Sequence, residues 1–211
     1  MAVPTTYTEL KAEIATWLAR TDLTSVIPNF ITMGEAYLNR RLRLLQMESE
    51  ASVTLSASAE TAALPTDWIE NISLRYSDNS AKLEQISAAK LADMKTTAEG
   101  KPSDYIITST YEFDRPADQE YTLKARFFSK WDITSDATNW LLTNAPDVYV
   151  FASMVEAGVY TRNQNMIALW TPKRDEGVKW LNSLDSRTRR NVKATLDPSL
   201  ASVGRFDINW G

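Results

Sequence analysis

The sequence predicts a mainly helical α+β fold, with a helical-bundle core, an antiparallel β-rich insertion and an extended C-terminal tail. The hydrophobic period is close to 3.6 residues in the N-terminal and C-terminal parts of the chain and close to two between them, which indicates helices on both sides of a set of strands. The helix expected over residues 148–160 is apolar nearly all round, so other elements must enclose it. We therefore expect one domain over residues 1–193, with helices within 6–45 and 146–190, a β-rich insert over 47–128, and an extended arm over 194–211.

The N-terminal part of the chain shows the helical period twice. The first expected helix covers residues 7–20, and Thr6 with Glu9 makes a capping box at its start. A second helix is expected over residues 26–45, and its last turns carry a basic cluster. Cations suit the negative end of a helix dipole, so we interpret the cluster as a helix end in preference to a phosphate site. The cluster comprises Arg40, Arg41 and Arg43.

A hydrophobic period of two follows, with turn residues between short apolar runs. Residues 78–80 read Asp-Asn-Ser, which is typical of a hairpin loop, and Ser87 can cap a short helix over residues 87–96. We expect the strands of this part to pair as an antiparallel set. They occupy residues 47–56, 72–76, 82–86, 105–108, 110–113 and 121–128.

Two further helices complete the helical part of the chain. Asn144 is expected to cap the central helix, with Pro146 and Asp147 in its first turn. The last helix covers residues 164–190, and Pro172 is expected to kink it or to restart it. The predicted order is therefore two helices, a β-rich insert, two helices and a tail.

Composition excludes several classes of function. The 211 residues include no cysteine and no histidine, which removes disulfides, thiolate chemistry, the usual general base and the commonest zinc ligand. The formal net charge of −4 argues against binding of nucleic acid through its phosphates. The first residues show no signal-peptide pattern and no long apolar run follows, so we expect no membrane segment and a protein of the cytosol or of an assembly formed there.

Paired carboxylates are the one catalytic arrangement that the composition leaves open, because two carboxyl groups suffice for a glycosidase. Asp67 with Glu70 and Glu112 with Asp114 are the candidate pairs. Charged residues on exposed turns and strand faces explain these positions better, so we expect no catalytic residue. The six glycines are scattered, and no carboxylates show the ligand spacing of a calcium or magnesium site, so we expect neither a cofactor nor a metal.

Glu156 differs from the other carboxylates because it falls within the apolar central helix. We expect it to pair with one of the arginines at residues 40–43, at a helix–helix or subunit contact. A general acid with a raised pKa is the alternative, but no second catalytic group lies near it in the sequence. The tryptophans occur at element ends or on apolar stripes, where we interpret them as core residues. They are Trp17, Trp68, Trp131, Trp140, Trp170 and Trp180.

Three segments carry a resemblance to a known family. The first reads Tyr7-Thr8-Glu9-Leu10 and continues through Trp17-Leu18, Ile27-Pro28, Glu35-Ala36 and Asn39-Arg40 to Gln46-Met47-Glu48. The second is Leu64-Pro65 with Asp67-Trp68 and Glu70, and the third is Thr138-Asn139-Trp140-Leu141-Leu142 with Pro146-Asp147, Glu156-Ala157 and Ala168-Leu169-Trp170. Together they resemble the head-to-tail adaptor proteins of short-tailed and related phages. The match covers most of residues 6–190 in the same order, with departures at the hairpin near Asp78 and at Pro172.

The resemblance implies a structural virion protein in which residues 1–193 form the adaptor domain. Such a protein assembles in the host cytoplasm as a twelve-subunit ring in the virion neck, between the portal protein and a tail or nozzle protein. DNA passes through the ring without specific binding, and the free protein can be monomeric. Two rival hypotheses stay open: a phage peptidoglycan hydrolase that uses paired carboxylates, and a host helical binding module. Zymography on cell walls tests the first rival, and electron microscopy with a portal ring tests the second.

The tail, residues 194–211, carries more apolar bulk than a solvated linker normally has. Near its end, apolar residues alternate with polar ones, which is the period of a strand with one buried face. A strand that returns to the β-rich insert of the same chain is one interpretation. We favour an arm that docks on the portal or on a neighbouring subunit. The candidate docking residues are Leu196, Leu200, Phe206, Ile208 and Trp210.

Overall fold

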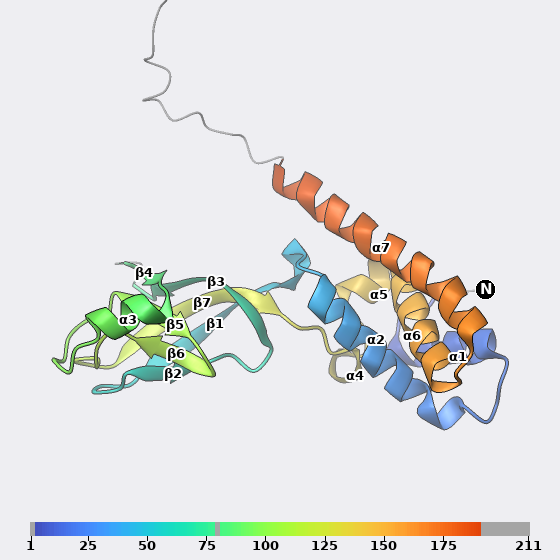
Figure 1. Ribbon diagram of the computed structural model, residues 1–211, viewed down its shortest axis with the longest axis horizontal. Coiled ribbons are helices and arrows are strands. Elements are labelled where there is room, and N and C mark those ends of the chain that lie inside the picture. The colour runs from blue at the N-terminus through green and yellow to red at the C-terminus, as the bar shows by residue number, and fades with distance from the viewer. Residues whose placement is uncertain (1–2, 79–80, 191–211) are drawn as a thin grey trace, which may run out of the picture.

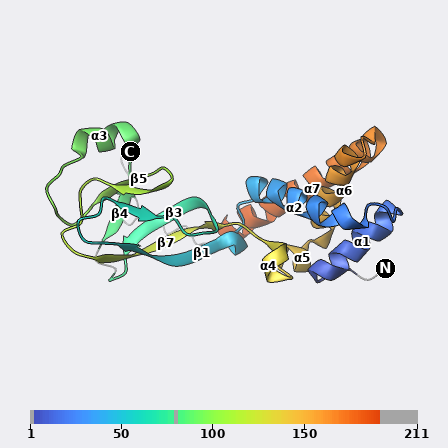
Figure 2. The same ribbon diagram turned by 90° about the horizontal axis from the view of Figure 1, so that it is seen from below.

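The computed structural model describes residues 3–78 and 81–190, which form two lobes along the long axis of the molecule (Figure 1). We call them the helical lobe and the β lobe, and Figure 2 shows the same division from below. Two short segments of chain, around residues 42–47 and 130–132, connect the lobes. The helical lobe contains α1 (Tyr7–Leu18), α2 (Ile27–Arg41), α4 (Ile133–Asp136), α5 (Trp140–Asn144), α6 (Pro146–Tyr160) and α7 (Gln164–Arg190), with 3₁₀ turns at Thr24–Val26 and Leu45–Met47.

The first two helices start and end for local reasons. In α1 the expected capping box is present, because the Glu9 N–H donates to Thr6 Oγ1 (3.3 Å) and the Thr6 N–H donates to Glu9 Oε2 (3.2 Å). The helix ends at Ala19, whose φ of 48° is left-handed. The second helix was expected to reach residue 45 but ends at Arg41, because Leu42 is extended and fully buried where the chain turns toward the β lobe.

The central helix of the prediction is confirmed as α6, which packs between α2 and α7. Both neighbours approach it closely through glycine. A Cβ on Gly34 of α2 would lie 3.1 Å from the backbone of Ala152, and a Cβ on Gly177 of α7 would lie 2.7 Å from Val148 Cγ2. Nine of its fifteen residues are buried, so other elements enclose α6 over most of its surface.

Two details of the helix ends differ from the prediction. Asn144 does not cap α6, because it ends α5 and its side-chain amide donates to the Trp140 carbonyl (2.8 Å). Pro146 does occupy the first turn of α6, as expected. Pro172 was expected to kink the last helix or to restart it, and the restart is wrong, because α7 is one helix of 27 residues. Packing of α7 along α6 outweighs the cost of a proline inside a helix, which is about 3 kcal/mol.

The β lobe holds a seven-stranded mixed sheet with the strand order β1-β7-β3-β4-β5-β6-β2. Neighbouring strands are antiparallel except for β4 and β5, which are parallel. The end strands β1 and β2 contact each other, so the sheet curls into a nearly closed barrel. The elements of this lobe are β1 (Glu48–Leu55), β2 (Thr61–Ala63), β3 (Trp68–Tyr76), β4 (Lys82–Gln85), α3 (Ala88–Met94), β5 (Asp104–Ile107), β6 (Thr110–Phe113) and β7 (Tyr121–Ser129).

The expected fold class, a helical-bundle core with an antiparallel β insertion, is therefore wrong. The sheet is mixed, and it encloses a hydrophobic core separate from that of the helical lobe, so the β lobe is a second packed body. The parallel pair arises because residues 86–103, which include α3, form a crossover connection long enough to bring the chain back to the end of the sheet at which β4 begins, so that β5 runs in the same direction. The β core is formed by Val53, Leu55, Ala62, Leu74, Tyr76, Leu83, Tyr105, Tyr111, Phe113, Ala117, Leu123, Ala125 and Phe127.

Candidate docking surfaces and the lobe junction

The first candidate carboxylate pair, Asp67 with Glu70, is divided between two cations. Lys130 Nζ lies 3.7 Å from Asp67 Oδ1, and Arg43 Nε donates to Glu70 Oε2 at 2.7 Å. Both carboxylates are largely exposed, at 58% and 59% of their side-chain surface. Their environment is that of solvated ion pairs, in which neither group is desolvated as a catalytic acid would be.

The second candidate pair is also tied to its own partners. Glu112 pairs with Lys95 at 3.1 Å, whereas Asp114 is fully buried and accepts the backbone N–H groups of Ser103 (3.0 Å) and Asp104 (3.3 Å). Asp114 therefore holds the start of β5 in place. Within the described residues, no group of three or more acidic side chains could hold a metal ion. No helix among them is long and apolar enough to span a membrane.

Glu156 does not pair with the arginine cluster, contrary to expectation. It forms no ion pair with any residue that the structure describes, and it lies half-buried at the edge of an apolar depression between α2 and α6. Among the described residues, Arg43 is the one member of the arginine cluster that forms an ion pair. Its partner is Glu70, at the lobe junction.

A different carboxylate, Glu35, is the buried one, and the sequence analysis missed it. Its oxygens accept the Tyr149 O–H (2.6 Å) and the Ile133 N–H (3.0 and 3.2 Å), and Asn139 in turn donates to the Tyr149 oxygen at 2.6 Å. Burial raises the pKa of Glu35 to about 7, although these hydrogen bonds act in the opposite direction. A signal existed, because Glu35 falls on the apolar stripe of α2 between Ile31 and Leu38.

Asn39, one helical turn after Glu35, fixes the same segment of chain. Its Oδ1 accepts the Trp131 N–H at 3.0 Å, and its Nδ2 donates to the Trp131 carbonyl at 2.9 Å. Together, Glu35 and Asn39 bind residues 131–133, where the chain leaves β7 and re-enters the helical lobe. One face of α2 thus holds the second connection between the lobes.

The last turns of α7 hold the first connection. Asp185 accepts the Leu45 N–H at 2.7 Å, and Arg189 lies 3.1 Å from Glu48 at the start of β1. Glu48 also pairs with Arg126 of β7, and its side chain is only 9% exposed. The largely buried Glu48 carboxylate is thus shared by two half-exposed arginines, one from α7 and one from β7, so these contacts join the C-terminal end of α7 to the β lobe.

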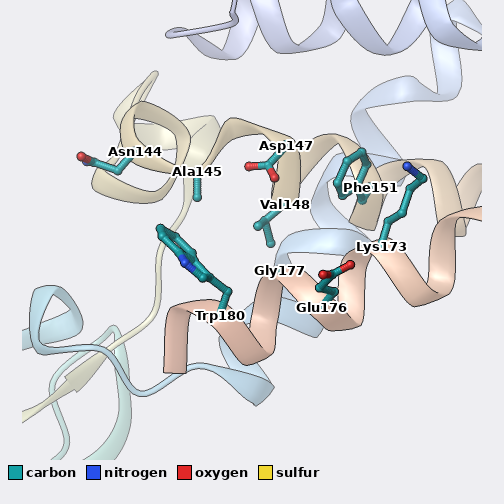
Figure 3. A pocket seen from close by; sticks show the side chains of 9 residues that line it. All are labelled: Asn144, Ala145, Asp147, Val148, Phe151, Lys173, Glu176, Gly177 and Trp180. Carbon is teal, nitrogen blue, oxygen red and sulfur yellow. The ribbon is translucent and has the colours of Figure 1, made fainter. Parts of the chain in front are cut away.

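A groove between α6 and α7, shown in Figure 3, is the first candidate docking surface. We call it the α7 surface. Val148 and Phe151 of α6 form its apolar wall, Lys173 lies at one end over the Phe151 ring, and Trp180 lies at the other end, reaching toward α5. Trp180 was expected in the core but is 55% exposed, and Leu184, one turn further on, is 39% exposed.

The second candidate surface is an apolar depression between α2 and the C-terminal end of α6, which we call the α2–α6 depression. Its side chains are unusually exposed for their type: Met33 60%, Val159 55% and Tyr160 59%. The Tyr160 ring packs against Phe30 at 5.3 Å between centroids, and Glu156 lies at the edge. Monomeric proteins seldom leave such residues together in solvent, so we interpret the depression as a binding surface.

The docking residues predicted in the tail, Leu196, Leu200, Phe206, Ile208 and Trp210, lie outside the residues that the structure describes. The last described turn of α7 carries Arg189, which belongs to the lobe junction.

Exposed apolar surfaces on the helical lobe are typical of proteins that bind other proteins. The family model of the SU10 adaptor protein matches residues 5–197, and the chain belongs to that family. It is thus a structural adaptor of a phage virion that interacts with other virion proteins, and the resemblance seen in the sequence is confirmed. A search among curated proteins finds no match to the chain.

Proposed function

We propose that this protein is a head-to-tail adaptor that forms a twelve-subunit ring beneath the portal, links the capsid to the tail and continues the DNA channel. The family match over residues 5–197 carries the proposal. The contacts of the lobe junction support it, because a subunit that transmits contact between a portal above and a tail protein below needs a fixed geometry between its parts. The neck of the virion is the corresponding location, and a portal and a tail or nozzle protein are the corresponding partners.

Electron microscopy of the purified chain mixed with portal rings tests this function directly. We expect a ring of twelve copies on one face of the portal, with the channel open along its axis. Binding to portal rings as scattered single copies, or no binding at all, would contradict the proposal. Clearing of a peptidoglycan gel, lost on changing Asp67 or Glu112, would favour the hydrolase instead.

DNA is expected to pass through the ring without being recognised. Residues 48–129 contain fourteen acidic and eight basic residues, and the chain as a whole carries a net charge of −4. Such a surface repels the phosphate backbone and releases few counterions on contact. We predict weak, sequence-independent affinity that vanishes at physiological salt, as measured by fluorescence anisotropy of labelled duplexes. Tight or sequence-selective binding under those conditions would overturn the prediction.

The arm at residues 194–211 is proposed to dock on the portal or on a neighbouring subunit. Removal of residues 196–211 should leave the melting temperature almost unchanged, because the hydrophobic cores of both lobes are formed by residues that precede the arm. The same removal should abolish attachment to portal-bearing heads. Calorimetry and co-sedimentation with heads measure the two effects.

A matched pair of full-length variants separates the apolar side chains of the arm from its length. Replacing Phe206 and Trp210 with alanine should weaken docking as much as truncation does, whereas replacing Asp207 and Asn209 should not. A truncated chain that melts well below the parent would show that the arm returns to its own β lobe. Full docking after truncation would show that other residues bind the portal.

A further inference from the structure

We propose that the arm of one copy adds a strand to the β lobe of a neighbouring copy, in a gap of the sheet between β3 and β4. The added strand consists of residues 205–210. The inference rests on the proposed function, because the exchange of arms supplies the lateral contact of the ring. It names the surface of the neighbouring subunit on which the arm docks.

The gap exists because β4 covers one end of β3. Strand β4 pairs with β3 at Leu74 and Arg75, at the end away from the helical lobe (Figure 1), and its next residues pair with β5. Within residues 3–78 and 81–190, no strand pairs with the rest of that edge of β3, residues 68–73. A strand edge without a partner is a template for a strand from another chain.

The side chains that line the gap include an apolar set. It consists of Ile72 of β3, Leu83 of β4 and Tyr105 of β5. Ile72 is an extra residue in the pairing of β3 with β7, and it is 37% exposed. The Tyr105 ring is buried, and its hydroxyl accepts a hydrogen bond from the Asn71 amide at 2.7 Å. An added strand would cover Ile72 with every second side chain.

The arm has the sequence pattern that this gap requires. Phe206, Ile208 and Trp210 alternate with polar residues, as in a strand that buries one face. Strand addition uses backbone hydrogen bonds for affinity and alternate side chains for specificity. The three apolar side chains of the arm therefore fit the apolar lining of the gap.

The charges beside the gap are complementary to those of the arm. Lys82 and Glu84 of β4 are exposed and lie two residues apart. Neither forms an ion pair within the part of the chain that the structure describes. Arg205 and Asp207 are also two residues apart, on the polar side of the arm pattern. The added strand supplies an anion for Lys82 and a cation for Glu84, and opposite charges on neighbouring strands stabilise their pairing.

The length of the arm permits exchange between copies. The last described residue of α7 is Arg190, and residues 191–204 can span up to about 50 Å before the added strand begins. Each copy carries both the arm and the gap, so passing the arm to the next copy in one direction uses both in every subunit. Repeated head-to-tail contacts of this kind close into a ring when the rotation permits.

Cross-linking between two cysteine variants tests the exchange, because the natural chain has no cysteine and gives no background. A mixture of E84C and D207C chains, docked on portal rings and treated with a short bismaleimide, should yield a covalent dimer with one chain of each kind. Either variant alone should stay at the mass of a single chain. E50C in place of E84C moves the thiol to β1, on the other side of β7 from β3, and should give no dimer.

Binding of a peptide gives a readout that does not depend on the portal. A fluorescent peptide of residues 201–211 should bind the full-length chain, as measured by anisotropy. The same peptide with alanine in place of Phe206 and Trp210 should bind at least about tenfold more weakly. Equal binding of the two peptides would contradict the placement of the apolar side chains in the gap.

A charge reversal locates the bound peptide. The chain with both K82E and E84K should bind the natural peptide about threefold more weakly than the parent does, because two cross-strand charge pairs become repulsive. A peptide with both R205E and D207K should restore the affinity. Equal binding of the natural peptide to the parent and to the reversed chain would contradict the proposed site.

The cross-linking outcomes separate this inference from the proposed function. A link within single chains that carry both E84C and D207C, with no dimer from the mixture, would overturn the exchange and show that the arm returns to its own β lobe. Full docking on the portal without the dimer would also overturn the inference, while the proposed function would stand. Failure of the parent to dock, with the peptide still bound at the gap, would count against the proposed function alone and support the strand site.

Discussion

Val155→Asp is expected to unfold the helical lobe, and not merely to weaken assembly. The side chain is 6% exposed on α6, the helix that packs between α2 and α7. An unpaired carboxylate in such a place costs several kcal/mol, whereas the free energy of unfolding of a whole domain is about 5–15 kcal/mol. The variant should lose its cooperative thermal transition or melt far below the parent, as measured by circular dichroism and calorimetry.

Val159→Asp is the matched control, because it makes the same change one turn later on the same helix. Val159 is exposed in the α2–α6 depression, so a carboxylate there stays hydrated and the melting temperature should change by only a few degrees. A soluble Val155→Asp protein with the melting curve of the parent would show that this face of α6 is a surface.

The elements that could be predicted from the sequence are those whose signals are local. Thr6 and Glu9 define the start of α1 within four residues of chain, and Ser87 caps α3 as expected. The apolar run after Pro146 defines α6 for the same reason. Capping side chains and helical periods act between neighbours in the sequence, so they can be read without knowledge of the fold.

The arrangement of the β lobe could not be predicted in this way, because strand pairing is decided between residues far apart. Leu55 of β1 pairs with Tyr121 of β7, although β2 to β6 lie between them in the sequence. The pairing of β4 with β5 depends on the path taken by residues 86–103, which no hydrophobic period specifies. Strand β2, at three residues, is too short to show a period at all.

The contacts of the lobe junction could not be predicted from the sequence either, because they also join residues that are far apart in the chain. Arg189 and Glu48 are separated by 140 residues, so nothing in the local sequence connects them. Exposure of Trp180 was equally hidden, since Val178 and Leu181 beside it on α7 are buried whereas Trp180 lies on another face of the helix and is 55% exposed. Glu35 could have been found, because a carboxylate on an apolar stripe predicts either a buried network or a pairing partner.

Glu35 leads to the second large prediction, which is that the protein becomes less stable as the pH rises from about 4.5 to 7. The folded protein holds a proton on this carboxyl up to a pKa of about 7, whereas the unfolded chain releases it near the ordinary value of 4.5. Between these values the folded state binds more protons, so its stability falls with increasing pH and is then constant with respect to this group. The full loss is about 3 kcal/mol, from about 1.4 kcal/mol for each unit of pKa.

The sequence contains no histidine, so no imidazole titrates between pH 5 and 7 and contributes to the change in stability over this range. Chemical denaturation at a series of pH values, for the parent and for Glu35→Gln, measures the effect. Glutamine keeps the shape and an acceptor for the Tyr149 hydroxyl but carries no charge at any pH, so the variant should lose the slope and exceed the parent in stability above pH 7.

Glu9→Gln serves as the control, because folding lowers the pKa of Glu9 whereas it raises the pKa of Glu35. Hydrogen bonds from Thr5 and Thr6 lower the pKa of Glu9, so its contribution is present above the ordinary carboxyl pKa and is lost only as the pH falls below it. The control should therefore keep the slope of the parent between pH 4.5 and 7. A parent whose stability is flat or rises across that window, or a Glu35→Gln variant that keeps the slope, would show that Glu35 is ionised in the fold. The hydrogen bonds from Tyr149 and Ile133 would then outweigh the cost of burying its charge.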